Sequence, residues 1–146
     1  MNDTYPITLD QQFFFGGNAT FTVESKKTGE HKTFKIRQTK PSPQFPNQSF
    51  MVSLLSGSDN ETSYSYIGIT NPLDGNLRLT KASKRTANSS DVITFNWLMK
   101  HLFTDKTLTN AVVHHVGKCG CCGRTLTVPE SIERGIGPEC WNKLNG

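Results

Sequence analysis

Four cysteines lie near the C-terminus of this 146-residue chain, and their spacing is typical of metal ligands. Cys119 and Cys122 are separated by two residues and followed by Gly123, a pattern in which two thiolates flank a tight turn. A glycine there can adopt the left-handed conformation that lets backbone N–H groups point at sulfur. Cys121 fits neither the gap nor the trailing glycine. We therefore interpret Cys121 as the spare thiol, while it stays open as a further ligand.

Cys140 follows Pro138, which suits the first turn of a helix, so this thiolate would be stabilised by a helix dipole. The turn from Cys119 to Gly123, which we call the knuckle, is followed by a ligand at a helix start, and this order predicts a treble-clef-like module. A structural zinc ion needs a fourth ligand, and two histidines lie just upstream on a predicted strand. Their side chains point to opposite faces of that strand, so only one can face the metal. We predict His115, with His114 as the reserve.

The predicted ligand set favours a structural role for the single zinc ion. Three thiolates and one imidazole make a closed site, whereas a catalytic zinc keeps an open position. A deaminase needs His-x-Glu upstream of Pro-Cys-x-x-Cys, but His114 is followed by His115 and Val116, and no proline precedes Cys119. An enzyme is therefore unsupported, and the alternative of a small zinc hydrolase would require an open metal site.

The elements that must position these residues can be read from the hydrophobic pattern. Alternating apolar and polar residues predict strands at 19–24, 33–37, 49–55, 64–70 and 76–80. Polar turns and a loop with three prolines separate them, at 25–31, 40–48, 56–60 and 71–75. The spacing then changes to three- and four-residue steps, which predicts a helix over 91–103, before a short strand over 111–116.

These patterns predict an α+β fold in which an antiparallel sheet packs one helix and is followed by a treble-clef-like zinc module. We place a β-rich domain at 1–110 and the zinc-binding module at 111–146. Gly16, Gly17 and Asn18 are not a phosphate-binding loop, because the Gly-Lys-Ser/Thr ending is missing and no helix pattern follows.

Basic residues are unevenly distributed along a chain of net charge +4. Lys35 and Arg37 share the polar face of one predicted strand, and Tyr64 and Tyr66 share a face of another. A sheet with basic and aromatic side chains can track phosphates and stack bases, although such residues can also be a solvated face and core. The net charge is modest for a dedicated DNA-binding protein. The candidate nucleic-acid contacts are Lys35, Arg37, Arg78, Lys81, Lys84, Arg85 and Arg124.

Other features bear on the location of the protein. No apolar run approaches the length of a transmembrane helix, and no secretory signal is visible at the start of the sequence. Clustered cysteines without such a signal indicate the reducing cytoplasm.

The segment from Cys119 to Cys140 resembles the tails of a family of small phage and prophage proteins. Those tails read Cys-x-x-Cys-Gly-Arg-x-Leu-Thr, then Pro-x-Ser, then Gly-x-Gly-Pro-x-Cys, and the family usually has another residue at the position of Cys121. Upstream, residues 16–22, 28–29 and 64–68 occur in the family's order. The resemblance implies a phage-type accessory protein of the host cytoplasm with one zinc ion, and it implies no activity.

Two functions follow as expectations. The first is a non-enzymatic protein that binds DNA or RNA, with zinc holding a C-terminal segment that is too short to build a core of its own. The alternative is a protein-interaction module that inhibits or adapts a host or defence protein through the same rigid tip.

Overall fold

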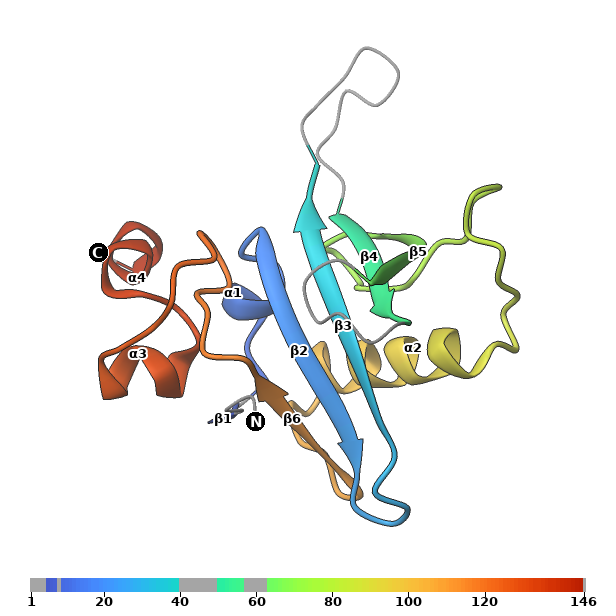
Figure 1. Ribbon diagram of the computed structural model, residues 1–146, viewed down its shortest axis with the longest axis horizontal. Coiled ribbons are helices and arrows are strands. Elements are labelled where there is room, and N and C mark those ends of the chain that lie inside the picture. The colour runs from blue at the N-terminus through green and yellow to red at the C-terminus, as the bar shows by residue number, and fades with distance from the viewer. Residues whose placement is uncertain (1–4, 8, 40–49, 57–62, 146) are drawn as a thin grey trace.

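A six-stranded antiparallel sheet forms the centre of the computed structural model, which describes residues 5–7, 9–39, 50–56 and 63–145. The strand order is β1-β6-β2-β3-β4-β5 (Figure 1). The strands are β1 (Tyr5–Pro6), β2 (Asn18–Ser25), β3 (His31–Gln38), β4 (Phe50–Leu55), β5 (Tyr64–Thr70) and β6 (Ala111–His115). The expected α+β class is therefore confirmed. The predicted loop at 40–48 and most of the turn at 56–60 lie outside the described residues.

The expected hairpin between the first two long strands is confirmed. In β2, Phe21 is fully buried and pairs with Phe34 of β3, while Thr22 and Thr33 pair on the other face through their hydroxyls, 2.7 Å apart. Because successive side chains of a strand alternate between faces, one face of the sheet is apolar and the other polar.

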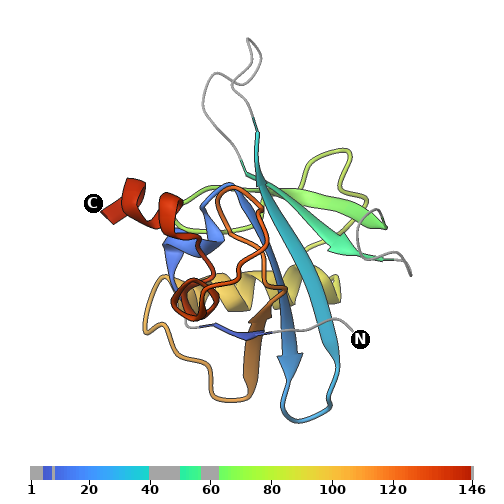
Figure 2. The same ribbon diagram turned by 60° about the vertical axis from the view of Figure 1, so that its left-hand side comes forward.

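Helix α2 (Ser90–Leu102) packs against the apolar face, and it is the amphipathic helix expected at 91–103 (Figure 2). The rings of Phe34 and Phe95 meet edge to face at a centroid distance of 5.5 Å. Burying each such side chain stabilises the fold by about 1.5–3 kcal/mol. The core residues that α2 contributes are Val92, Phe95, Leu98, Met99 and Leu102.

The remaining helices are α1 (Gln11–Phe14), α3 (Pro129–Arg134) and α4 (Pro138–Asn145). The sequence pattern did not reveal α1, which is only one turn long and begins where Asp10 accepts a hydrogen bond from the N–H of Gln12 at 2.9 Å. It did predict the start of α4 at Pro138.

The predicted strand at 76–80 is reduced to a single bridge between Ile69 and Arg78. The reason lies next to the bridge, where the N–H of Leu77 donates to the side chain of Asn96 on α2 at 2.8 Å. Because Gly75 has φ +71° and the N–H of Leu77 is bonded to α2, the segment does not continue as a ladder along β5.

Strand β6 joins the C-terminal part of the chain to the sheet. It begins at Ala111, the first residue of the expected zinc-binding module. It is hydrogen bonded to β1 on one side and to β2 on the other. The C-terminal segment therefore supplies an inner strand of the main sheet before the cysteines begin.

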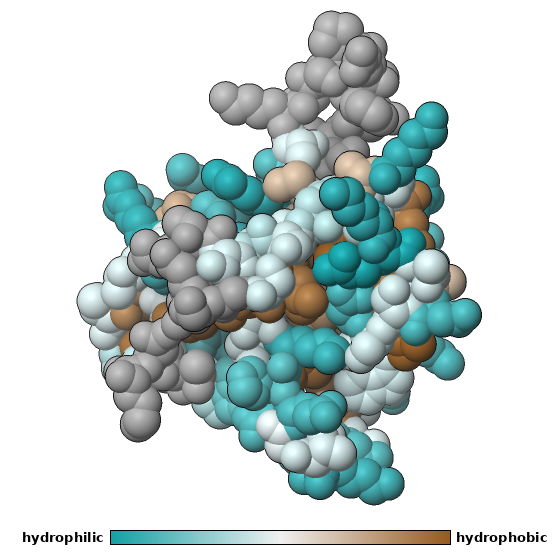
Figure 3. Space-filling view, turned by 45° about the vertical axis from the view of Figure 1, so that its right-hand side comes forward, coloured by the Kyte–Doolittle hydropathy of each residue, from teal (hydrophilic) through white to brown (hydrophobic). Residues whose placement is uncertain are grey.

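No helix of the described part of the chain lies on the polar face of the sheet, which we call the open face (Figures 1 and 2). Figure 3 shows the side of the molecule that carries β4, β5 and the loop after them, where hydrophilic side chains surround small hydrophobic patches.

Candidate metal centre

The cysteine-rich turn is a short hairpin that follows β6. Lys118 and Thr125 form an antiparallel bridge, and the N–H of Cys119 donates to the carbonyl of Arg124 at 2.8 Å. Gly123 has φ +79°, the left-handed conformation expected after the second cysteine of a knuckle. The sequence pattern thus predicted the local geometry of this turn.

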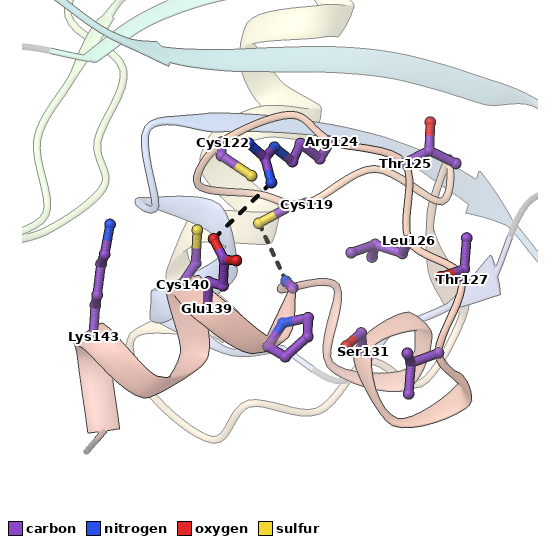
Figure 4. A pocket seen from close by; sticks show the side chains of 13 residues that line it. Cys119, Cys122, Arg124, Thr125, Leu126, Thr127, Ser131, Glu139, Cys140 and Lys143 are labelled. Atoms are coloured by element: carbon purple, nitrogen blue, oxygen red, sulfur yellow. Dashed lines mark hydrogen bonds and ion pairs between the residues drawn. The ribbon is translucent and has the colours of Figure 1, made fainter.

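Three thiols meet at this hairpin. The sulfur atoms of Cys119, Cys121 and Cys140 all lie within 4.8 Å of one another. Cys122 is more exposed, and its thiol contacts those of Cys119 and Cys140. Figure 4 shows the side chains of Cys119, Cys122 and Cys140 converging from the hairpin and from α4. These cysteines could hold a metal ion.

Backbone donors favour the charged form of Cys119. Burial by itself raises the pKa of this thiol, but N–H groups of Gly137, Cys122 and Cys121 point at its sulfur and together lower the pKa to about 7. The N–H of Gly137 lies 3.2 Å from the sulfur, and that of Cys121 lies 3.4 Å away. A buried sulfur with several N–H donors is the environment of a metal-bound thiolate.

The neighbouring thiols are held in the neutral form when no metal is bound. Burial raises the pKa of Cys121 to about 11, and the charge of Cys119 acts in the same direction. Burial, followed by hydrogen bonds to Cys122 and Cys119, raises the pKa of Cys140 to about 12. Since like charges that share one small volume repel, an added cation is the natural way to ionise all of these thiols together.

His115 lies apart from the cysteine group. The ring is fully buried between Tyr5 and Phe13, and its Nδ1 accepts a hydrogen bond from the N–H of Gly117 at 3.0 Å. Its Nε2 therefore carries the proton and donates to the carbonyl of Ile132. Burial lowers the pKa of the imidazole, in agreement with this neutral form. With both nitrogens engaged within the fold, His115 lies outside the group of converging thiols, and that group includes Cys121.

His114 projects from the opposite face of β6, as expected for neighbouring residues on a strand. It lies across from Thr22, and its Nε2 is 3.6 Å from a carboxylate oxygen of Glu24. The reserve ligand is therefore on the open face of the sheet, away from the thiols.

The glycines before β2 pack directly against the knuckle. A Cβ atom on Gly16 would come within 2.8 Å of the sulfur of Cys121 and of the carbonyl of Gly120. The N–H of Asn18 donates to that same carbonyl at 2.7 Å. The sequence pattern excludes a phosphate loop at these residues but does not reveal this role. The available signal was the pair of consecutive glycines directly after a run of phenylalanines.

Phe13 of α1 connects the main hydrophobic core to the cysteine hairpin. Its ring is fully buried, and a Cβ atom on Gly120 or on Gly135 would come within 2.7 Å of it. The N–H of Gly120 also donates to the carbonyl of Gly135 at 2.8 Å, which joins the knuckle to the end of α3. The cysteine hairpin is thus packed against the same core that α2 covers.

A cavity of about 370 Å³ opens beside the cysteines, between the hairpin and the last two helices (Figure 4). Arg124 and Glu139 face each other at its mouth, 4.0 Å apart and both well exposed, so this ion pair contributes little to stability. Ser131 lies on the far side, and its hydroxyl is buried without a hydrogen-bond partner among the described residues.

The basic candidates occupy different positions. Lys35 lies on the open face with its ammonium 4.2 Å from the centre of the Tyr64 ring. Arg37 and Arg78 are exposed, and Lys81 and Lys84 are exposed in the loop that follows. Arg85 differs from the others, because its Nε donates to the buried carboxylate of Asp91 at 2.7 Å. The structure thus gives Arg85 a partner within the fold.

The comparison with known families found one match, in the C-terminal part of the chain. A model described as a family of unknown function, DUF6011, matches residues 109–145, about a quarter of the chain. The matched segment begins just before β6 and includes the cysteines, α3 and the whole of α4. The chain has no match among curated proteins or among solved structures.

Of the helices in the described residues, none has the length and apolar character needed to cross a membrane.

Proposed function

We propose that the cysteine cluster holds one structural zinc ion. In a tetrahedral site with Zn–S distances of about 2.3 Å, the sulfur atoms lie about 3.8 Å apart. Three of the thiols already lie within 4.8 Å of one another, so only a small closure is needed. The residues that would hold the ion are Cys119, Cys121, Cys122 and Cys140. Bound zinc would fix the knuckle to α4, and no open coordination position would remain for catalysis.

Metal analysis and cobalt substitution test this proposal. We expect about one zinc ion per purified chain. Replacing zinc by Co²⁺ should give the visible bands of a tetrahedral ion and near-ultraviolet sulfur-to-cobalt bands with the intensity of four thiolates. Bands with the intensity of three thiolates would contradict the four-cysteine ligand set, and the absence of bound metal would reject the site.

We further propose that the protein is a non-enzymatic nucleic-acid-binding protein, and the open face of the sheet is the observation that carries this. Arg37 and Arg78 are exposed and have no acidic partner among the described residues, while Lys35 lies over an aromatic ring on the same face. Cations close to apolar and aromatic side chains suit a polyanion with stacked rings. The resemblance of the C-terminal motifs supports a phage-type accessory role in the cytoplasm.

The test is a series of binding measurements on single- and double-stranded DNA and RNA at 50 and 200 mM salt. With three cation–phosphate contacts on a single strand, the logarithm of the affinity should fall with a slope of about −2 against the logarithm of salt concentration, or close to twentyfold over this range. Salt-insensitive binding, or no binding at 50 mM salt, would contradict the proposal.

A protein-interaction role is the second candidate, and one observation favours it. A groove of about 320 Å³ lies between α2 and the sheet, lined by Ile93, Trp97 and Ala111. Ile93 is 54% exposed, which is unusual for a large apolar side chain on a packed helix. Ile93→Asp should abolish capture of a protein partner in the expression host if this role is correct, and it should leave nucleic-acid affinity unchanged.

A further inference from the structure

We infer that a single-stranded nucleic acid lies across the open face of the sheet, perpendicular to the strands, along a row formed by Asn18, Arg37, Met51, Ile69 and Arg78. This inference rests on the proposed function and adds two things to it, the form of the nucleic acid and its path.

The row follows from the register of the sheet. Asn18 of β2 lies directly opposite Arg37 of β3, which lies opposite Met51 of β4. Met51 lies opposite Ile69 of β5, and Ile69 forms the isolated bridge with Arg78. Directly opposed residues project from the same face, so all five side chains lie side by side on the open face.

The chemistry of the row alternates between charge and apolar surface. Arg37 and Arg78 are exposed, and the two residues between them, Met51 and Ile69, are half-buried. With neighbouring strands about 4.8 Å apart, the two arginines are separated by about 14 Å along the row. This arrangement offers two phosphate contacts with an apolar floor between them.

The knuckle lies at one end of the row. The backbone of Gly123 rests on the side chain of Asn18, because a Cβ atom added to this glycine would come within 3.1 Å of the amide nitrogen. Arg124 is the next residue and is exposed. The knuckle therefore brings the backbone of a third arginine to the Asn18 end of the row, and the guanidinium of this residue lies 4.0 Å from a carboxylate oxygen of Glu139. The metal module would then serve to place this cation.

The rest of the open face shows why the ligand would follow this row. In the next row, Lys35 is held over Tyr64, and the hydroxyl of Tyr66 lies 2.9 Å from that of Thr80. Toward the β2–β3 turn, the exposed carboxylate of Glu24 adds negative charge to the face. The arginine row itself contains no carboxylate, so a polyanion is favoured there over the part of the face next to Glu24.

The apolar floor favours a single strand over a duplex. Met51 and Ile69 can pack on the flat face of an unpaired base, whereas a duplex hides its base faces and presents phosphates at its outer surface. From Asn18 to Arg78 the row crosses four strand spacings, about 19 Å. The row is therefore long enough for a short unpaired segment.

The experiment compares a fluorescein-labelled oligo(dT) 12-mer with a labelled 12-base-pair duplex by anisotropy from 50 to 200 mM salt. The variants are Arg37→Ala, Arg78→Ala and the double variant. The matched control is Lys26→Ala/Lys27→Ala, which removes two exposed cations from the β2–β3 turn at the far end of the sheet. Ile69→Thr tests the apolar floor, because threonine retains β-branching on a strand. Circular dichroism checks that each variant is folded.

We expect the single strand to bind more tightly than the duplex. Each arginine variant should lower affinity for it about five- to tenfold at 50 mM salt and reduce the salt slope by about 0.7. Ile69→Thr should lower affinity without changing the slope, and the lysine control should change neither.

Three results would overturn the inference. Equal or tighter binding of the duplex would reject the single strand. Unchanged binding by the arginine variants, with loss in the lysine control, would reject the path and leave the proposed function intact. No binding of either probe at 50 mM salt would reject the inference and the proposed function together.

Discussion

Single side chains around the cysteines divide into those that offer sulfur and those that hold the sulfur in place. Cys119 receives backbone hydrogen bonds from both sides, from the knuckle itself and from Gly137 before α4. His115 supplies no donor to the thiols, yet its two nitrogens join β6 to the segment that follows. A histidine near a zinc-type motif can thus serve the metal site by positioning the chain.

The first prediction separates these two roles. Cys121→Ser should reduce zinc affinity as severely as Cys140→Ser, because both thiols belong to the converging group. His115→Gln should retain one metal per chain but lower the free energy of unfolding by about 1–3 kcal/mol, because buried hydrogen bonds are lost. Chelator competition and urea denaturation measure the two quantities. Full zinc affinity in Cys121→Ser would restore its interpretation as the spare thiol.

The second prediction concerns Arg85, which the sequence grouped with the nucleic-acid contacts. Its guanidinium neutralises Asp91, whose other carboxylate oxygen accepts from the N–H of Val92 at 2.8 Å in the first turn of α2. Arg85→Ala should therefore lower the free energy of unfolding by about 1–3 kcal/mol and leave nucleic-acid affinity nearly unchanged. Denaturation and anisotropy on the same variant check both parts. Lost affinity without lost stability would contradict this assignment.

At the scale of elements, the position of the knuckle depends on the chain that enters β2. Consecutive glycines remove the side chains that would otherwise separate β2 from the hairpin, and Phe13 fills the space behind it. The cysteine hairpin therefore makes a close backbone contact with residues that are about a hundred positions away in the sequence.

The third prediction tests this contact. Gly16→Ala places a methyl group 2.8 Å from the sulfur of Cys121, so the knuckle must shift and zinc affinity should fall. We expect a destabilisation of about 1–3 kcal/mol from the overpacking. The control is Gly29→Ala, which meets nothing within 4 Å but has φ +76°. It should cost about 1–2 kcal/mol of backbone strain and leave zinc affinity unchanged. Equal zinc affinity in both variants would show that the contact does not position the knuckle.

At the scale of the whole molecule, the sheet and the cysteine module share one core. Cys119, Leu126 and Ile136 are buried in the same hydrophobic cluster as Phe21 and Phe95. Since β6 also lies inside the sheet, we expect residues on both sides of position 110 to unfold together.

The fourth prediction uses the two tryptophans as separate reporters, one on α2 and one on α4. The variants Trp97→Phe and Trp141→Phe each leave one fluorophore, and thermal unfolding of the two should give coincident midpoints. Removing zinc should lower both midpoints together. At a metal concentration of 100 Kd the linkage is about 2.7 kcal/mol, which corresponds to roughly 5–10 °C. Separate transitions would instead support independent units divided near residue 110.

The sequence by itself determined the local structure. Alternation defined the hairpin and the strands β4 and β5, three- and four-residue spacing defined α2, and the cysteine–glycine pattern defined the knuckle turn. These features depend on side-chain periodicity and backbone conformation over a few residues. The types of neighbouring residues are therefore enough to predict them. Pro138 indicated the start of α4 for the same reason.

Only the tertiary structure decided which distant groups meet. The sequence placed His115 beside the knuckle, but its ring packs between Tyr5 and Phe13 and its two nitrogens are hydrogen bonded to backbone groups within the fold. Spacing alone set Cys121 aside, although the hairpin and α4 bring its sulfur into the group. The row that ends at Arg78 likewise exists only through strand register. Such contacts depend on the pairing and packing of segments that are far apart along the chain. Local sequence patterns do not predict which of these segments will pair with one another.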